Sequence, residues 1–176
     1  MQEYFGNIID LIGEVGAVCI TTNMFVKNNG RAVMGKGIAR AITCVVENID
    51  LSLGDAISNG EKVCVIATVK NTDIIAFPVK GRGFELNSEY DLDDVVNHMK
   101  DSFDVGDFIP GWACKAEPGI IRASCQELVC LANSKEYKNV YVPRPGCGAG
   151  ELSYNDIKPI LEEELDNRFY ISTFAR

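Results

Sequence analysis

Residues 17–47 read AVCITTNMFVKNNGRAVMGKGIARAITCVVE and contain three successive patterns. The segment 17–22 is a continuous run of apolar and β-branched residues, which is typical of a strand buried on both faces. A loop with several glycines follows, and residues 35–47 then have the periodicity of a helix with one apolar face. The apolar positions of this predicted helix are Ile38, Ile42, Val45 and Val46. A strand, a glycine-containing loop and a helix in this order indicate an α/β protein.

The same alternation of patterns continues along the chain. We expect further strands at 2–5, 63–69, 74–79, 139–143 and 169–174. Helical patterns occupy 119–133 and 154–166. Ser153 or Asp156 is the expected N-cap of the last helix. Pro159 fits this helix because we expect it in the first turn. Strands alternating with helices predict a three-layer α/β/α sandwich with a mixed, largely parallel central sheet.

Residues 81–111 interrupt this order and are rich in acidic side chains. Between 85 and 107 there are eight acidic residues and one basic residue, Lys100, so this part carries a net −7 of the chain's −8. We interpret 81–111 as an acidic insertion on the surface of a single domain, 1–176, and expect a short helix at 91–103. The acidic insertion is either a solvated flap or a lid or partner-docking element.

The composition limits the class of partner and the location. The chain outside the acidic insertion is nearly neutral, so long-range attraction to a DNA or RNA backbone is not supported. Seven cysteines without a CxxC pair are interpreted as buried thiols in a reducing compartment. No apolar run is long enough to span a membrane and the N-terminus lacks a secretory signal, so we expect a cytoplasmic location. His98 is the only histidine, and we expect no metal and no cofactor.

Two glycine-rich loops follow predicted strands. The first contains Gly30, Gly35 and Lys36 at the spacing of a phosphate-binding P-loop. Gly37 stands where that motif needs Ser or Thr to hold magnesium, so a nucleoside triphosphatase is disfavoured. The second loop reads PRPGCGAGELSY at 143–154. Ligands of open α/β sheets bind at the carboxyl ends of the strands, and glycine exposes backbone N–H groups to anions. We therefore expect the two loops to clamp a diphosphate.

These segments together resemble the signatures of macro domains. Asn23, VMGKGIA at 33–39, FPVK at 77–80 and VPRPGCGAGEL at 142–152 occur in the order typical of that family. Residues 112–128 are also similar to the segment that directly follows FPVK in related phage and bacterial sequences. The resemblance covers nearly the whole chain apart from the acidic insertion. It implies an α/β/α module that binds ADP-ribose or an ADP-ribosylated substrate, from a phage or bacterial source.

The resemblance also implies a set of ligand-binding positions. Asn7 stands where macro domains often carry an Asp that contacts the adenine amino group, and an amide oxygen also accepts that hydrogen bond. Asn23 matches the residue that faces the distal ribose, and Phe174 is expected either to stack on adenine or to fill the core. The glycine-rich loops match those that pack against the distal ribose and bind the diphosphate. The full set is Asn7, Ile8, Asn23, Met34, Gly35, Lys36, Gly37, Ile38, Pro145, Gly146, Cys147, Gly148, Ala149, Gly150 and Phe174.

Lys36 and Asn23 are the catalytic residues that the resemblance implies. We expect hydrolysis of an ADP-ribosyl linkage, in which both residues orient the ribose and stabilise charge while water or Lys36 attacks the anomeric carbon. One alternative is a non-catalytic ADP-ribose reader or sequestering protein. Another is a phosphatase acting on ADP-ribose 1″-phosphate. If that phosphatase depended on a histidine, His98 would have to lie in the site, with the acidic insertion folded over it.

Several neighbouring residues have two interpretations. Asn28 and Asn29 either form a turn next to Gly30 or position a water at the distal ribose. Arg144 either reaches a phosphate or caps a strand end. Trp112 is expected to be a hydrophobic anchor for the acidic insertion. We expect a monomer with no membrane partner, and nucleic acid only as a modified substrate.

Overall fold

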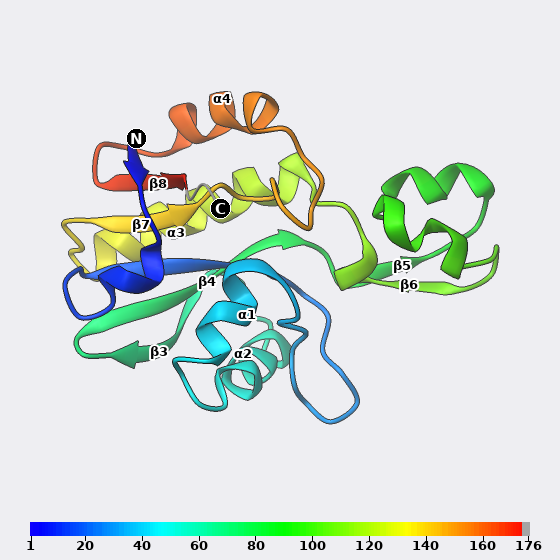
Figure 1. Cartoon of the computed structure of the whole chain (residues 1–176), viewed down its shortest axis with the longest axis horizontal. Coiled ribbons are helices and arrows are strands. Elements are labelled where there is room, and N and C mark those ends of the chain that lie inside the picture. Colours follow the sequence, from blue (N-terminus) through cyan, green and yellow to red (C-terminus); the bar gives the residue numbers. More distant parts are fainter. Residues whose placement is uncertain (174–176) are drawn as a thin grey trace.

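The central sheet of the protein, seen in a computed structural model, has six strands in the order β1-β8-β7-β2-β4-β3 (Figure 1). The structure describes residues 1–173. Neighbouring strands are parallel except for β3, which pairs antiparallel with β4 at one edge. The strands are β1 (Gln2–Phe5), β2 (Ala17–Asn23), β3 (Cys64–Val69), β4 (Thr72–Lys80), β7 (Val140–Pro143) and β8 (Phe169–Thr173). The predicted mixed, largely parallel sheet is confirmed.

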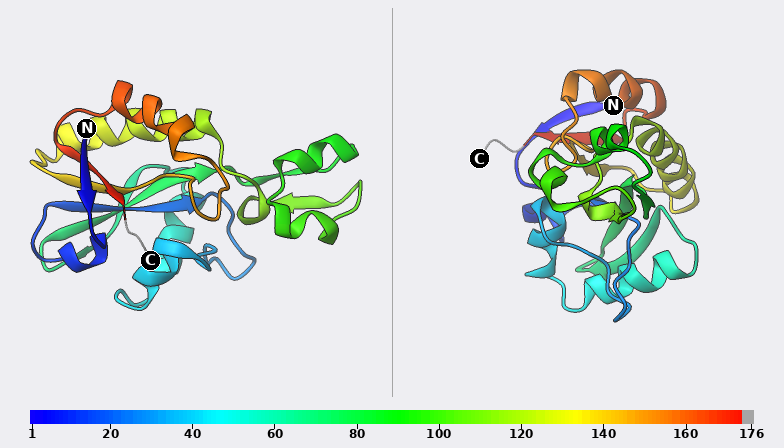
Figure 2. Two further views of the ribbon diagram at one scale, coloured as in Figure 1. Left: turned by 45° about the horizontal axis from the view of Figure 1, so that its top comes forward. Right: turned by 90° about the vertical axis from the view of Figure 1, so that its right-hand side faces the viewer.

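Helices cover both faces of this sheet and complete the predicted three layers (Figures 1 and 2). Val18 and Ile20 of β2 lie in the core beneath one pair of helices. Ala17 and Cys19 lie in the core on the opposite face. Successive side chains of a strand point to opposite faces, so a continuous apolar run is buried on both sides. The first pair is α1 (Gly37–Thr43) and α2 (Ile49–Ser58), and the second is α3 (Pro118–Ser134) and α4 (Tyr154–Glu164).

Two helices differ from the sequence prediction. α1 ends at Thr43 rather than at residue 47, and Val45, expected on its apolar face, is 49% exposed. The sequence patterns predict no helix where α2 lies, and Gly54 in its interior lowers helix propensity. The folded chain requires glycine here, because a Cβ at Gly54 would lie 1.9 Å from the carbonyl oxygen of Gly30. Packing against the first glycine-rich loop therefore explains α2 better than local propensity does.

α3 and α4 lie where the helical patterns place them. Ser153 is the N-cap of α4, and its hydroxyl accepts a hydrogen bond from the N–H of Asn155 at 3.3 Å. The sequence patterns place Pro159 in the first turn of this helix. α4 begins directly after Ser153, so Pro159 lies in the second turn instead. Proline has no N–H for the carbonyl group four residues earlier. Burial of Ile157 and Leu161 in the core shared with α3 stabilises the helix despite this loss.

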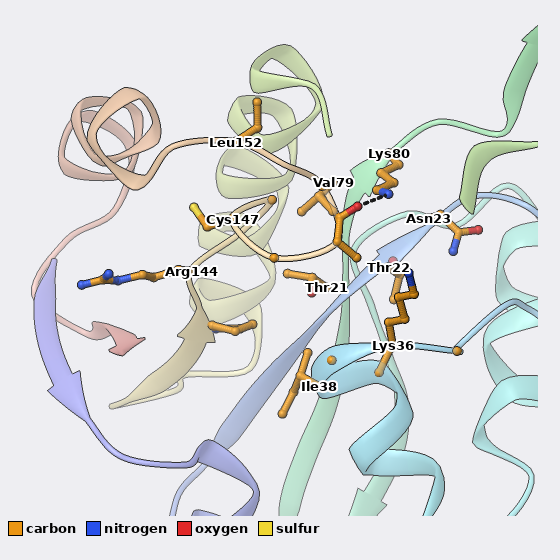
Figure 3. Close-up of a pocket in the computed structure, with 18 of the residues that line it drawn as sticks. Thr21, Thr22, Asn23, Lys36, Ile38, Val79, Lys80, Arg144, Cys147 and Leu152 are labelled. Atoms are coloured by element: carbon orange, nitrogen blue, oxygen red, sulfur yellow. Dashed lines mark hydrogen bonds between the residues drawn. The ribbon is translucent and has the colours of Figure 1, made fainter. Parts of the chain in front are cut away.

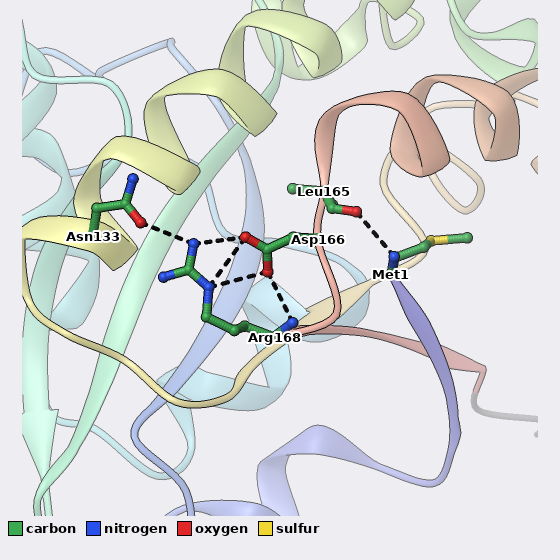
Figure 4. Close-up of polar contacts among 5 residues, drawn as sticks. All are labelled: Met1, Asn133, Leu165, Asp166 and Arg168. Carbon is green, nitrogen blue, oxygen red and sulfur yellow. Dashed lines mark hydrogen bonds and ion pairs between the residues drawn. The ribbon is translucent and has the colours of Figure 1, made fainter.

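Polar contacts hold the turn between α4 and β8 and the start of β1 (Figure 4). Nε of Arg168 lies 3.0 and 3.1 Å from the carboxylate oxygens of Asp166, and a second nitrogen donates to Oδ1 of Asn133 at 2.8 Å. Hydrogen bonds from Arg168 lower the pKa of the Asp166 carboxyl. The N-terminal ammonium group of Met1 donates to the carbonyl of Leu165 at 2.9 Å. These contacts fix the parallel pair β1 and β8 at one edge of the sheet.

The acidic insertion, 81–111, extends away from the sheet and has a small core of its own (Figures 1 and 2). Two 3₁₀ helices replace the single short helix predicted at 91–103. Trp112 is absent from this core and is 37% exposed, so its expected anchoring role is wrong. The buried side chains of this core are Leu86, Val95 and Ile109 of the insertion, together with Ala113 and Cys114, which follow it closely in sequence. The elements are β5 (Gly83–Glu85), 3₁₀ helices at Glu89–Asp94 and Asn97–Ser102, β6 (Phe108–Pro110) and a 3₁₀ turn at Gly111–Ala113.

Candidate functional site

A cleft of about 970 Å³ crosses the carboxyl ends of four neighbouring strands (Figure 3). In the order of the sheet, the strand residues that line it include Thr173 of β8, Pro143 of β7, Asn23 of β2 and Lys80 of β4. The acidic insertion follows β4 along the chain and adds Val96, His98 and Met99 to the lining. Both glycine-rich loops form walls of the same cleft. The carboxyl edge of a parallel sheet is where such folds bind ligands.

The second glycine-rich loop contains glycines of two kinds. Gly146 has φ +76°, and a Cβ there would lie 2.9 Å from the Cβ of Ala116. A Cβ at Gly150 would lie 2.6 Å from the same atom. These two glycines are required by packing inside the protein. Gly148 has no heavy atom within 4 Å of an ideal Cβ and no left-handed backbone, so nothing within the described chain requires glycine there. Its missing side chain leaves room for a ligand to approach the backbone.

The inner part of the first loop is held by Asn23 at the end of β2. Its Nδ2 donates to the carbonyl of Val33 at 3.0 Å, and its Oδ1 accepts from the N–H of Phe25 at 3.0 Å. Asn23 therefore fixes the loop as well as lining the cleft. Gly35 and Gly37 have no heavy atom within 4 Å of an ideal Cβ, and Gly37 has φ +58°. Like Gly148, they leave the cleft open beside the backbone.

The outer part of the first loop is tied to α2. Arg31 forms an ion pair with the Asp50 carboxylate at 2.7 Å, and the N–H of Ala32 donates to the Asp50 carbonyl at 2.9 Å. Oδ1 of Asn29 accepts from the N–H of Arg31 at 3.2 Å. Neither Asn28 nor Asn29 is among the residues that line the cleft. The structure thus favours the turn interpretation for these asparagines over a role in positioning water.

The lining of the cleft differs in charge from the rest of the chain. It contains Lys36, Lys80, Arg144 and His98, and no Asp or Glu among the described residues. The whole sequence has 25 acidic and 17 basic residues, so a lining without a carboxylate is not what composition predicts. Basic side chains in a concave site concentrate anions. The electrostatics of the cleft therefore favour an anionic ligand.

Lys80 is a functional candidate that sequence reasoning missed (Figure 3). Its side chain is 6% exposed, and its Nζ donates to the carbonyl of Ala149 at 2.8 Å and to that of Trp112 at 3.3 Å. Burial lowers the pKa of Lys80 to about 8; Lys36 adds to this lowering, whereas Cys114 and Glu151 oppose it. The available signal was the sequence FPVK, in which a lysine ends an otherwise apolar strand.

One side of the acidic insertion lines the cleft and contacts both of its glycine-rich loops. Nζ of Lys36 lies 2.9 Å from Nε2 of His98. A lysine ammonium only donates, so Nε2 accepts and the proton of a neutral His98 lies on Nδ1. The carboxylate of Glu151, which has φ +60°, accepts from the backbone N–H of Asn97 at 2.9 and 3.1 Å and from its Nδ2 at 2.7 Å. The insertion is thus a wall of the cleft and not only a solvated flap.

Some buried polar atoms in the cleft have no partner within the protein. In residues 1–173, the buried side-chain nitrogen and oxygen atoms without a hydrogen-bond partner are Oγ1 of Thr22, Nε of Arg144 and Oγ1 of Thr173. All three residues line the cleft. The Arg144 guanidinium carbon also lies 3.8 Å from the ring centroid of Tyr154, which holds this side chain beside the cleft. Buried polar groups normally have partners, so these three atoms are exceptions among the described residues.

The structure brings most of the sequence-predicted ligand residues together, with three exceptions. Met34 is buried in the core beneath α1 and Pro145 is also buried, and neither lines the cleft. Phe174 lies outside the described residues. Asn7 lines the cleft, but its Oδ1 already accepts from the N–H of Ile9 at 3.2 Å. The predicted residues that line the cleft are Asn7, Ile8, Asn23, Gly35, Lys36, Gly37, Ile38, Gly146, Cys147, Gly148, Ala149 and Gly150.

Residues 1–173, the part of the chain that the structure describes, lack two features. No group of three or more His, Cys, Asp or Glu side chains is placed to hold a metal ion there. Within the same residues, no helix is both long and apolar enough to cross a membrane.

Several solved structures have the same arrangement of strands and helices. The macrodomain of Mycobacterium tuberculosis DarG superposes with a TM-score of 0.65 and 20% identity, over 97% of this chain and 95% of that one. The macrodomain of Thermus aquaticus DarG superposes with a TM-score of 0.66 and 18% identity, over 100% and 99%. Thermosipho africanus DarTG, in complex with ADP-ribose, has a TM-score of 0.60 and 16% identity, over 92% of this chain and 38% of that one.

These similarities establish the fold of the chain. No family model and no curated protein sequence matches it. The structural matches nevertheless extend over nearly the whole chain and agree with one another. The protein therefore has the macrodomain fold, as the sequence signatures at 33–39 and 142–152 predict.

Proposed function

We propose that the cleft binds ADP-ribose or a close derivative. The observation that carries this proposal is the lining, which holds three cationic side chains, an imidazole and, in the described residues, no carboxylate. Backbone N–H groups of glycine-rich loops bind phosphate groups through fixed partial charges, so the lysines need no metal to assist them. The complex of the Thermosipho protein with ADP-ribose supports this choice of ligand for the shared fold.

The strand order sets the direction of the ligand in this proposal. The diphosphate lies between the loop at 35–37 and the loop at 146–150. The adenosine end lies toward β8, beside Asn7. The distal ribose lies toward β4, where Asn23 and Lys80 line the cleft. This direction agrees with the roles that the sequence resemblance implies for Asn7 and Asn23.

The same site then hydrolyses an ADP-ribosyl linkage, with Lys80 acting beside Lys36. A pKa of about 8 makes the neutral amine roughly 300-fold more abundant at pH 7 than in an ordinary lysine. Its two carbonyl partners use two N–H groups, which leaves the lone pair of the neutral amine to take a proton from water. That water attacks the anomeric carbon while the leaving group departs with the bonding electrons, and Lys36 stabilises the charge. The products are ADP-ribose and the protonated leaving group.

Calorimetric titration with ADP-ribose, AMP and ATP tests the binding step. We expect ADP-ribose to bind at least about tenfold more tightly than AMP, which lacks the second phosphate and the distal ribose. Lys36→Ala should weaken ADP-ribose binding, whereas Lys100→Ala, which removes the same charge outside the lining, should not. Equally weak binding of all three nucleotides by the wild-type protein would overturn the proposal.

Release of ADP-ribose from an ADP-ribosylated peptide and from an ADP-ribosylated oligonucleotide tests the hydrolase step. Lys80→Met should abolish release while calorimetry still detects ADP-ribose binding. Lys36→Ala should lower the rate by about tenfold or more, the cost of removing one charged stabilising group. A wild-type protein that binds ADP-ribose but releases none from either substrate would support the alternative of a reader or sequestering protein.

A further inference from the structure

The acidic insertion contains a two-stranded sheet that is covered on one face. Ile109 of β6 is buried in the core of the insertion, and its partner on β5, Phe84, packs against that core. Successive residues of a strand point to opposite faces, so the next pair, Glu85 and Phe108, lies on the other face. Glu85 is exposed there, and Phe108 is 51% exposed. The outer face of this sheet therefore presents an aromatic side chain to solvent.

The side chain of Phe108 is placed against Gly83 on the neighbouring strand. A Cβ at Gly83 would lie 2.9 Å from Cζ of Phe108 and 2.1 Å from the carbonyl oxygen of Ile109. Gly83 also has φ +124°, a conformation that other residues rarely adopt. The missing side chain of Gly83 thus leaves room for the ring of Phe108. An aromatic group that is already held by its own sheet loses little conformational entropy when a partner binds.

Other large apolar side chains are exposed on the same insertion, which projects away from the central sheet (Figures 1 and 2). Besides Phe108, they are Tyr90 on the first 3₁₀ helix and Val105 in the turn that precedes β6. None of the three lines the cleft, and none belongs to the core of the insertion. Exposed apolar groups gathered on a small region are typical of interaction sites. Neither the cleft nor the folding of the insertion accounts for these side chains.

The charge around this face indicates the kind of partner. Of the eight acidic residues between 85 and 107, Asp93 alone forms an ion pair within 4.0 Å in residues 1–173, with Lys100 at 3.3 Å. Acidic groups without counter-ions attract a basic surface and repel a nucleic acid. Among the described residues, no three His, Cys, Asp or Glu side chains are placed to hold a metal ion. A second copy of the chain has the same acidic insertion on a nearly neutral body, so it offers no basic excess.

We propose that the outer face of the β5–β6 sheet docks a basic polypeptide segment of another protein. An apolar side chain of that segment packs on Phe108, and its lysine or arginine side chains lie near the carboxylates of the insertion, Glu85 among them. This inference goes beyond the proposed function and does not depend on it, because neither Phe108 nor Glu85 lines the cleft. The acidic insertion is then a partner-docking element as well as a wall of the cleft.

Fluorescence anisotropy of three labelled peptides, titrated with the full chain, tests the docking face. The first peptide alternates lysine and leucine, the second has serine in place of leucine, and the third has glutamate in place of lysine. We expect the lysine–leucine peptide to bind at least about tenfold more tightly than the lysine–serine peptide, and added salt to weaken its binding. The glutamate peptide should not bind. Equal affinity for the first two peptides would overturn the apolar docking face, because charge alone would explain it.

Variants of the face locate the binding. Phe108→Ala should lower the affinity for the lysine–leucine peptide by about tenfold. The matched control is Val45→Ala, which removes an apolar side chain that is 49% exposed outside the insertion and should change nothing. Glu85→Gln removes one charge beside Phe108 at constant shape and should lower affinity by about threefold. Thermal unfolding shows whether Phe108→Ala still folds; if it does not, Glu85→Gln decides. Unchanged affinity in the folded variants would overturn the proposal.

Two further measurements separate this inference from its alternatives. We expect the wild-type protein to sediment as one species at every concentration. A concentration-dependent dimer that Phe108→Ala abolishes would assign the face to a second copy of the chain and overturn the basic partner. Phe108→Ala should bind ADP-ribose as the wild type does. If the wild type fails to bind ADP-ribose, the proposed function alone fails, whereas failure to bind the lysine–leucine peptide removes only the docking face.

Discussion

Two walls of the cleft are built in different ways. The second glycine-rich loop is fixed by close packing, because Gly146 and Gly150 leave no room for a side chain beside Ala116. The acidic insertion has a separate core and contacts the two glycine-rich loops through polar groups on Asn97 and His98. Disrupting close packing lowers the free energy of unfolding substantially, whereas exposed polar contacts contribute little to it.

This difference teaches where affinity and selectivity reside. A wall that is part of the hydrophobic core holds its shape without a ligand, so it suits the part of a ligand that is always bound. A wall held by exposed polar contacts changes with little effect on the fold, so it suits the choice between related ligands. Lys80 links the two, because its amine donates to Ala149 in one wall and to Trp112 at the base of the other.

The largest effect is expected from Gly150→Val in the packed wall. A Cβ at this position would lie 2.6 Å from both the Ala116 Cβ and the Gly146 carbonyl oxygen, so the loop must shift. We expect the free energy of unfolding to fall by about 1–3 kcal/mol, and ADP-ribose affinity to fall by more than about tenfold. Thermal unfolding and calorimetry measure the two effects. Wild-type stability in this variant would show that the loop is not fixed by packing.

Gly148→Ala separates binding from packing within the same loop. An ideal Cβ at Gly148 meets no heavy atom within 4 Å, so the methyl group projects into open space. We expect unfolding stability to stay the same or to rise by less than about 1 kcal/mol, while ADP-ribose affinity falls by about tenfold. The matched comparison is Gly60→Ala, a glycine that also has open space but lies outside the lining; its left-handed backbone predicts lower stability and unchanged affinity.

Lys80 predicts a pH dependence of stability. Its pKa is lowered to about 8 in the folded protein, so between that pH and the usual range of lysine the unfolded chain holds a proton that the folded chain has released. Stability therefore rises with pH across this window. Relative to Lys80→Met, the wild-type melting temperature should increase as pH rises from about 8 toward about 10.5. If the difference in melting temperature between the wild type and Lys80→Met stayed constant across this pH range, burial would not lower the pKa of Lys80.

The smallest effect is expected from Glu151→Ala, which frees the acidic insertion from the packed wall. The variant loses the acceptor for the N–H and Nδ2 of Asn97. We expect faster hydrogen exchange at the Asn97 amide and a change in unfolding free energy within about 0.5 kcal/mol. Glu151→Gln keeps one acceptor oxygen and should exchange at an intermediate rate. Unchanged exchange in both variants would show that other contacts hold this wall.

The sequence predicts the packed wall better than the polar one. Continuous apolar runs such as 17–22 identify buried strands, and glycines after two of them identify the loops that line the cleft. The polar wall depends on a contact between residues 97 and 151, which are 54 positions apart. Neither Asn97 nor Glu151 carries a local signal of that pairing. For the same reason, sequence patterns alone do not decide whether the acidic insertion is a solvated flap, a lid or a partner-docking element.

Local patterns also fail where a tertiary contact overrides them. Gly54 lowers the helix propensity of α2, yet the helix forms because its backbone packs against Gly30. Met34 lies next to Gly35 in the first glycine-rich loop, but its side chain is buried in the core and does not line the cleft. In both cases, the sequence neighbours of a residue do not determine whether that residue is packed inside the protein or faces solvent.

Strand and helix periodicity, together with the glycine-rich loops, determined the α/β class and the edge of the sheet where a ligand would lie. These features are local, because they depend on side-chain spacing within one element or on the backbone freedom of one residue. Only the tertiary structure decided that Lys80 is buried among carbonyl groups and that His98 lies against Lys36. Burial and charge contacts depend on segments that are distant in sequence. The fold therefore determines the lowered pKa of Lys80 and the contact of Lys36 with His98.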